Sequence, residues 1–127
     1  MAEHGAFYWN ELLTKDVRKA RDFYTGILGW QVEEMDMPNG AKYTVVKAGD
    51  SPAGGIMGLA DTMGRGRTSH WFAYIAVDDV DATVAKVEGA GGKVESPPFD
   101  VPGVGRIAII TDPTGAAVGI MTPAQQG

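Results

Sequence analysis

The stretch KDVRKARDFYTGILGW, residues 15–30, decides the fold because it contains one complete helix with both of its ends. Asp16 can cap the start of this helix, and Gly29 can end it in the left-handed conformation that glycine adopts easily. The preceding stretch FYWNELL is apolar enough for a strand. Apolar residues at helical spacing form the predicted inner stripe: Val17, Ala20, Phe23 or Tyr24, Ile27 and Leu28.

The same pattern recurs about 63 residues later, in HWFAYIAVDDVDATVAKVEGAGGKV. A strand over 71–77 leads to Asp79, which corresponds to Asp16, and glycines at 91 and 92 follow the helix, with Gly92 corresponding to Gly29. The tripeptide GIM also occurs twice, at 55–57 and 119–121. The second inner stripe comprises Val80, Val84 and Val87.

This internal repeat predicts the architecture. Each half reads as a strand, a helix and three further strands, so we expect an α+β fold of two tandem βαβββ modules whose curved mixed sheets enclose a shared cavity. The chain is one domain over 1–127. Its parts are module one (about 6–60), a glycine-rich linker (about 61–69) and module two (about 70–123).

The composition excludes several classes of protein. A formal net charge of −5 and the lack of a basic run argue against binding nucleic acid. The absence of cysteine excludes disulfides and thiolate ligands, and no apolar run is long enough to span a membrane. No signal peptide is indicated, so a cytoplasmic location is expected. A homodimer is compatible with the sequence, although no residue pattern requires one.

Residues 7–123 resemble the vicinal-oxygen-chelate superfamily, the group of glyoxalases, bleomycin resistance proteins and extradiol dioxygenases. The resemblance rests on KDVRKARDFYTGILGW and on FDVPGVGRIAIITDPTGAAVGIMTP, residues 99–123. The wording FYWNELLTKD is similar to a glyoxalase-like branch around actinobacterial antigens and anthracycline-type pathways.

The resemblance implies a divalent metal held by His and Glu at four corners, acting as a Lewis acid on the substrate. The corresponding positions here are Trp9, Phe72, Gly55 and Gly119, and none has a side chain that can bind a metal. We therefore predict no cofactor and a cavity that is lined by Trp9 and Phe72 and opened by the two glycines. Such a cavity suits a flat, apolar or conjugated small molecule. Phe99, in the segment PPFDVPGVGR, is expected at the tip of a loop over the cavity mouth.

Three polar residues share strand faces with these aromatic positions: Glu11, two residues after Trp9, and His70 and Tyr74 on either side of Phe72. Glu11 and His70 could form an acid/base pair, with Tyr74 donating to a carbonyl or phenolate. They could alternatively bind a displaced metal if His4 joined them as a third ligand. Each also has a purely structural interpretation. Glu11 could be a paired carboxylate, His70 a hydrogen-bonded residue at a strand edge, and Tyr74 a residue of the cavity wall.

These observations leave three functions open. The first is a metal-free protein that binds a small, conjugated molecule. The second is a lyase, isomerase or oxygenase that works without a metal, or with shifted ligands, through Glu11, His70 and Tyr74. The third is a domain with a purely structural role or one that binds a partner protein.

Overall fold

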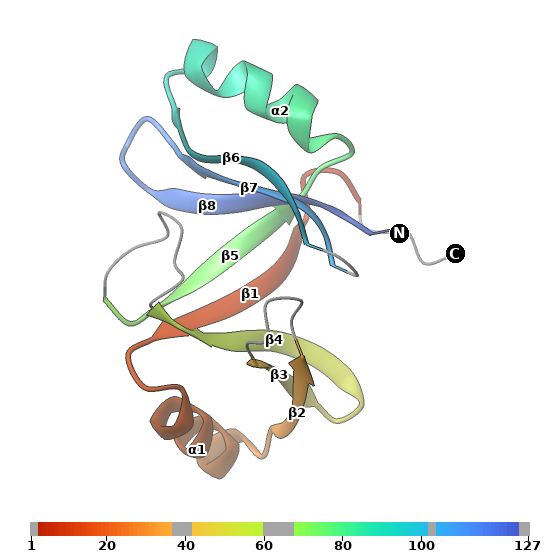
Figure 1. Ribbon diagram of the computed structural model, residues 1–127, viewed down its shortest axis with the longest axis vertical. Helices are drawn as coiled ribbons and strands as arrows, with labels where there is room; N and C mark the ends of the chain where they lie inside the picture. The colour runs from red at the N-terminus through yellow and green to blue at the C-terminus, as the bar shows by residue number, and fades with distance from the viewer. Residues whose placement is uncertain (1–2, 37–41, 60–67, 102–103, 125–127) are drawn as a thin grey trace. The chain divides into compact units, whose positions relative to one another are not determined.

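The computed structural model describes residues 3–36, 42–59, 68–101 and 104–124, and it confirms the repeated βαβββ order in an α+β fold (Figure 1). Neither α-helix in these residues is long and apolar enough to cross a membrane. The first copy comprises β1 (Phe7–Thr14), α1 (Val17–Leu28), β2 (Gln31–Asp36), β3 (Lys42–Ala48) and β4 (Ser51–Gly58). The second copy comprises β5 (His70–Ala76), α2 (Val80–Val87), β6 (Lys93–Val101), β7 (Gly105–Thr111) and β8 (Ala117–Pro123).

Both helices begin as the repeat predicts. The Asp16 carboxylate accepts the Lys19 backbone N–H at 3.0 Å, and the Asp79 carboxylate accepts that of Ala82 at 3.1 Å. Gly29 ends α1 at φ 69°. The end of α2 differs from the prediction, because a 3₁₀ turn over Glu88–Ala90 follows it and places Gly91, not Gly92, in the left-handed conformation.

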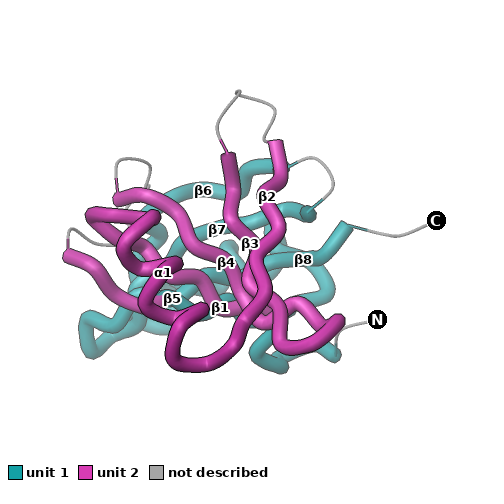
Figure 2. The backbone as a smooth tube through the Cα atoms, turned by 90° about the horizontal axis from the view of Figure 1, so that it is seen from below, with its two compact units in different colours: residues 1–8, 63–65, 72–127 teal, residues 9–62, 66–71 magenta. Residues whose placement is uncertain are grey.

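The chain divides into two compact units (Figure 2). We call residues 9–62 and 66–71 the N-terminal unit, and residues 1–8, 63–65 and 72–127 the C-terminal unit. In the N-terminal unit the strands lie in the order β2-β3-β4-β1, and in the C-terminal unit the order is β5-β8-β7-β6. The pairs β1–β4 and β5–β8 are parallel, whereas the others within each unit are antiparallel. Each unit therefore has a mixed sheet.

The core of the N-terminal unit lies between α1 and the sheet. Leu12, Val46 and Ile56 form its buried centre, against which α1 packs Val17, Ala20 and Tyr24, together with other partly buried side chains. The predicted stripe was correct for these three helix positions.

Of the alternatives Phe23 and Tyr24, the inward-facing residue is Tyr24, and Phe23 is exposed. The prediction was wrong for Ile27 and Leu28, which are also exposed. Tyr24 shares a helix face with Val17 and Ala20 at spacings of seven and four residues, whereas Phe23 lies about 100° away around the helix. This leaves an apolar surface on α1 that sequence periodicity did not separate from the core.

The core of the C-terminal unit follows the prediction more closely. Val80 and Val87 are buried, and Val84 packs against the cluster formed by Val77, Val80, Ala108 and Ile120. The inner face of α2 is therefore the one that the spacing of its valines indicates.

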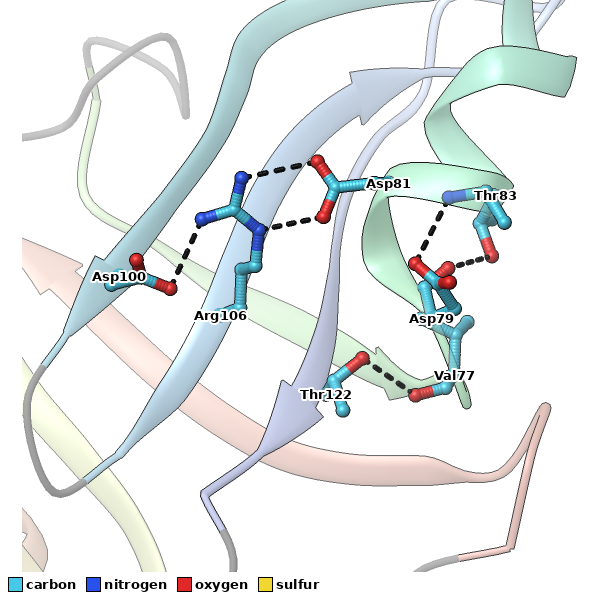
Figure 3. A network of polar contacts seen from close by, with 8 residues as sticks. Val77, Asp79, Asp81, Thr83, Asp100, Arg106 and Thr122 are labelled. Atoms are coloured by element: carbon cyan, nitrogen blue, oxygen red, sulfur yellow. Dashed lines mark hydrogen bonds and ion pairs between the residues drawn. The ribbon is translucent and has the colours of Figure 1, made fainter.

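Arg106 joins three elements of the C-terminal unit on its surface (Figure 3). From β7, its guanidinium donates two hydrogen bonds to Asp81 on α2, at 2.7 and 3.0 Å, and one to Asp100 on β6, at 3.0 Å. The bidentate contact holds the pKa of Asp81 below its ordinary value, and the two carboxylates raise the pKa of Arg106. The network ties the start of α2 to β6 and β7.

Removing the cap of α2 should destabilise the protein. Asp79→Ala leaves the Ala82 N–H without its acceptor, and we expect a loss of about 1 kcal/mol in the free energy of unfolding. Asp79→Ser, which retains an acceptor oxygen, should lose less. Urea unfolding followed by circular dichroism measures both, and equal losses would contradict a capping role.

The Arg106 network should add acid sensitivity. Because the folded pKa of Asp81 is lowered, its contribution to stability is complete above its unfolded pKa of about 4 and is lost as the pH falls through the folded value. The melting temperatures of wild type and Asp81→Asn should therefore differ most at neutral pH and converge in acid. Asp50→Asn, in the exposed β3–β4 turn, serves as the control and should show no such convergence.

Candidate functional site

The N-terminal unit contains a buried carboxylate, Glu11, in the middle of β1. Glu11 is only 5% exposed, and the Tyr43 hydroxyl donates a hydrogen bond to its carboxylate at 2.8 Å. The indole N–H of Trp9 donates to the same hydroxyl at 3.0 Å. Indole, phenol and carboxylate therefore form a hydrogen-bonded series, and the Tyr43 hydroxyl both donates and accepts within it.

A glycine makes this series possible. Glu11 pairs with Gly55 on β4, and Val45 on β3 pairs with Gly55 from the other side, so Tyr43 is a diagonal neighbour of Gly55. The Tyr43 ring must pass over β4 to reach Glu11 on β1. A Cβ atom at Gly55 would lie 1.7 Å from the Tyr43 hydroxyl oxygen, which no side chain could tolerate without displacing the ring.

The C-terminal unit has a glycine in the matching place. Tyr74 on β5 pairs with Gly119 on β8, and a Cβ at Gly119 would lie 2.2 Å from the Tyr74 ring. Tyr74 and Phe72 are each 3% exposed, and their rings meet edge to face at 5.3 Å. Tyrosine rings thus occupy the space beside both glycines, where the sequence suggested open space in a cavity lined by Trp9 and Phe72.

The register confirms the internal repeat at the level of single residues. Glu11 and Tyr74 occupy equivalent positions, since each pairs in parallel with the glycine that begins a GIM tripeptide. One copy therefore carries a carboxylate where the other carries a phenol. Whether Trp9, Gly55, Phe72 and Gly119 contact a ligand stays a prediction.

The two histidines are tied to backbone groups. Nδ1 of His70, at the start of β5, lies within hydrogen-bonding distance of the Thr68 carbonyl oxygen, which can only accept, so Nδ1 carries a proton. His4 is in the C-terminal unit, and its Nδ1 accepts the Asp78 backbone N–H at 2.9 Å. Nδ1 of His4 is therefore engaged in a structural contact and is not available to a metal while that bond lasts.

The four corner positions do not fit the metal that the resemblance implied. Trp9 and Phe72 have no ligand atom of the usual kind, and the side-chain space at Gly55 and Gly119 is filled by tyrosine rings. Among residues 3–36, 42–59, 68–101 and 104–124, no three or more His, Cys, Asp or Glu side chains are grouped so that they could hold a metal ion.

Phe99 lies in a strand and not in the predicted loop. It belongs to β6, where it pairs with Ile107 on β7, and it is half-buried. The loop prediction was wrong because two prolines before Phe99 are accommodated by register shifts in an outer strand, where proline is tolerated. Contact between Phe99 and a ligand remains a prediction.

Sequence reasoning missed Tyr43. It falls inside a strand that the repeat predicts, but nothing in its local pattern marks it as a partner of Glu11. The available signal was Gly55 itself, because a glycine inside a strand often marks the close approach of another group.

Two units built from the same strand and helix order define a protein of paired βαβββ modules. The chain belongs to the glyoxalase/bleomycin resistance protein/dioxygenase superfamily, whose sequence profile matches residues 7–120. In the solved structure of methylmalonyl-CoA epimerase from Mycobacterium tuberculosis, the same fold aligns with a TM-score of 0.66 and 18% identity, over 98% of this chain and 93% of that chain.

Two curated relatives are closer in sequence. A Mycobacterium tuberculosis protein named "Putative glyoxylase CFP32" is 44% identical over 98% of this chain and 46% of its own length. The "Anthracycline biosynthesis protein DnrV" of Streptomyces peucetius is 38% identical over 91% of this chain and 46% of its own length. The chain thus spans about half the length of these two curated relatives.

The packing of Tyr43 over Gly55 predicts that alanine destabilises the protein more at position 55 than at position 58. Gly55→Ala should destabilise the protein by about 1–3 kcal/mol, the usual cost of overpacking, because the added methyl collides with the Tyr43 ring. Gly58→Ala is the matched control on β4, since nothing lies within 4 Å of its would-be Cβ. Urea unfolding measures both variants. Adding Tyr43→Ala to Gly55→Ala should make the losses less than additive, and full additivity would argue against the collision.

Proposed function

We propose that this protein binds a small, planar, conjugated molecule without a metal ion, using Trp9, Glu11 and Tyr43 of the N-terminal unit. The observation that carries the proposal is the hydrogen bond from Tyr43 to Glu11 across Gly55. It places the Tyr43 hydroxyl, bonded to the Glu11 carboxylate, where a side chain at Gly55 would begin, and Gly55 is one of the positions at which the family resemblance calls for a metal ligand. In this proposal, hydrogen bonding takes the place of Lewis-acid chemistry.

The chemistry of these three side chains suits a ligand with an aromatic face and polar edges. The Trp9 ring offers a surface for stacking, while its N–H holds the Tyr43 hydroxyl in place. The Glu11 carboxylate accepts from a phenol or enol of the ligand, as it does from Tyr43. The name of the relative DnrV supports this ligand class, since anthracyclines are fused-ring conjugated compounds.

A second candidate is an enzyme in which Glu11 is the general base. A buried carboxylate that is oriented by a phenol can take a proton from a substrate carbon or hydroxyl and return it at another position, which is an isomerase step that needs neither a redox partner nor a leaving group. His70 and Tyr74 are then further acid/base candidates. A site with shifted metal ligands would need His4 to give up its bond from Asp78, which disfavours it.

Calorimetric titration with anthraquinone-2-sulfonate in the presence of EDTA tests the first candidate. We expect binding that persists without metal and weakens roughly threefold to tenfold in Trp9→Ala, because one stacking contact is lost. Tyr8→Ala, an exposed neighbour on β1, is the control and should bind as wild type does. Binding that requires added metal, or that is unaffected by Trp9→Ala, would overturn the proposal.

A second arm of the same experiment separates binding from turnover. Glu11→Gln keeps the hydrogen-bonding shape of the side chain but cannot take up a proton, so a binding protein should retain most of its affinity for the probe. If an added substrate is converted by wild type and not by a folded Glu11→Gln variant that still binds, the enzyme interpretation is correct.

A further inference from the structure

Trp9 and Glu11 together surround one hydroxyl group, which Tyr43 supplies in this structure. The Trp9 indole N–H can only donate, and it reaches the Tyr43 oxygen at 3.0 Å. The Glu11 carboxylate can only accept, and it lies 2.8 Å from the same oxygen. A donor and an acceptor that meet at one point fit a group that both accepts and donates. Phenols and enols have such a group, whereas ethers and ketones can only accept.

The hydroxyl of Tyr43 occupies the position that a ligand's hydroxyl would need. Glu11 is 5% exposed, so an incoming molecule reaches its carboxylate only after a neighbouring side chain has moved. Tyr43 is such a neighbour, because its hydroxyl is bonded to the carboxylate and its ring lies over Gly55. A ligand that bonds to Glu11 in this way therefore competes with Tyr43 for one position.

The place of Tyr43 in the sheet allows its side chain to move. Tyr43 is the second residue of β3, and the pairing of β3 with β4 runs from Thr44 to Ala48, so Tyr43 lies just outside that pairing. On the other side it pairs with Met35 of β2, which is exposed. Tyr43 is half-buried, so part of the residue already faces solvent. A change of rotamer can carry the ring outward without breaking the pairing of β3 with β4.

Tyr74 lacks these properties, although its ring fills the equivalent space in the C-terminal unit. It pairs directly with Gly119 of β8 and is 3% exposed. Its ring also meets Phe72 edge to face at 5.3 Å. The C-terminal unit thus has a fully buried aromatic pair at the position where the N-terminal unit has a half-buried tyrosine over a carboxylate.

We propose that Tyr43 determines specificity by being displaced: a phenol or enol of the ligand takes the place of the Tyr43 hydroxyl between Trp9 and Glu11. A planar molecule without such a hydroxyl stacks on Trp9 and leaves Tyr43 where it is. This inference rests on the proposed function, because it assumes that the ligand binds at Trp9 and Glu11. The apparent affinity for a hydroxylated ligand is then lowered to the extent that Tyr43 holds the position in the free protein.

Titration of three matched naphthalene sulfonates in the presence of EDTA tests this inference. The first probe, 6-hydroxynaphthalene-2-sulfonate, carries the hydroxyl. The second, naphthalene-2-sulfonate, lacks it, and the third, 6-methoxynaphthalene-2-sulfonate, has an oxygen that can only accept. Tyr43→Phe removes the competing hydroxyl and keeps the ring. We expect it to bind the hydroxylated probe about tenfold more tightly than wild type does, and the other two within about twofold of wild type, because only the first gains a hydrogen bond to a charged acceptor.

Two further variants serve as controls. Tyr24→Phe also removes a tyrosine hydroxyl that accepts an indole N–H in the same unit, at 3.2 Å from Trp71, and it should bind all three probes as wild type does. Adding Glu11→Gln to Tyr43→Phe replaces the charged acceptor by a neutral one, so most of the gain for the hydroxylated probe should be lost. Melting temperatures measured for every variant show that each is folded.

Fluorotyrosine NMR of the wild type gives a readout that does not depend on the stability of Tyr43→Phe. The chain has four tyrosines, and the signal of Tyr43 is identified by replacing each of the other three with phenylalanine. This signal should move when the hydroxylated probe is added and should stay nearly unchanged with naphthalene-2-sulfonate.

The outcomes separate this inference from the proposed function. A gain confined to the hydroxylated probe, with a matching movement of the Tyr43 signal, supports displacement. Binding of naphthalene-2-sulfonate that depends on Trp9, without a selective gain in Tyr43→Phe, leaves the stacking site in place and overturns the displacement of Tyr43. Weaker binding of the hydroxylated probe by Tyr43→Phe, or an equal gain for all three probes, also overturns it. Absence of binding by every probe, anthraquinone-2-sulfonate included, overturns both proposals.

Discussion

The hydrogen bond from Tyr43 to Glu11 depends on the absence of a side chain at Gly55, and much of the candidate site depends on that bond. β4 lies between the strands that carry the two partners, so the phenol must cross it, and a single methyl group would lie 1.7 Å from the hydroxyl oxygen. The bond gives a buried carboxylate a partner, which it requires because burying an unpaired charge is costly. It also orients Trp9, whose N–H donates to the same oxygen.

In the C-terminal unit, a different set of side chains fills the space beside the equivalent glycine. Tyr74 pairs directly with Gly119 and fills the space beside it with its own ring, and Phe72 packs against that ring edge to face. The two copies of the repeat thus share a backbone register and a glycine, but one carries an acid and the other a phenol at the matching strand position. Divergence of this kind gives two related units different chemical properties while the fold is kept.

The exposed apolar side chains of the N-terminal unit follow from the composition of α1. α1 covers its sheet with Val17, Ala20 and Tyr24, and a helix of 12 residues with further apolar side chains cannot direct all of them inward. Phe23, Ile27 and Leu28 consequently face outward beside Trp71. In the C-terminal unit, α2 is shorter, its valines lie on one face, and Arg106 ties its first turn to β6 and β7 through Asp81 and Asp100. The two helices therefore present different surfaces.

The sequence by itself determined the βαβββ repeat, both N-terminal caps and the family, because these follow from local spacing and residue chemistry. It also singled out Glu11, Gly55, Tyr74 and Gly119. Only the tertiary structure decided that Tyr43 joins Glu11, that tyrosine rings fill the space beside both glycines, and that Phe99 lies in a strand. Those outcomes depend on which side chains from neighbouring strands meet, and strand order, register and ring direction are set by packing over long sequence separations, which local periodicity does not contain.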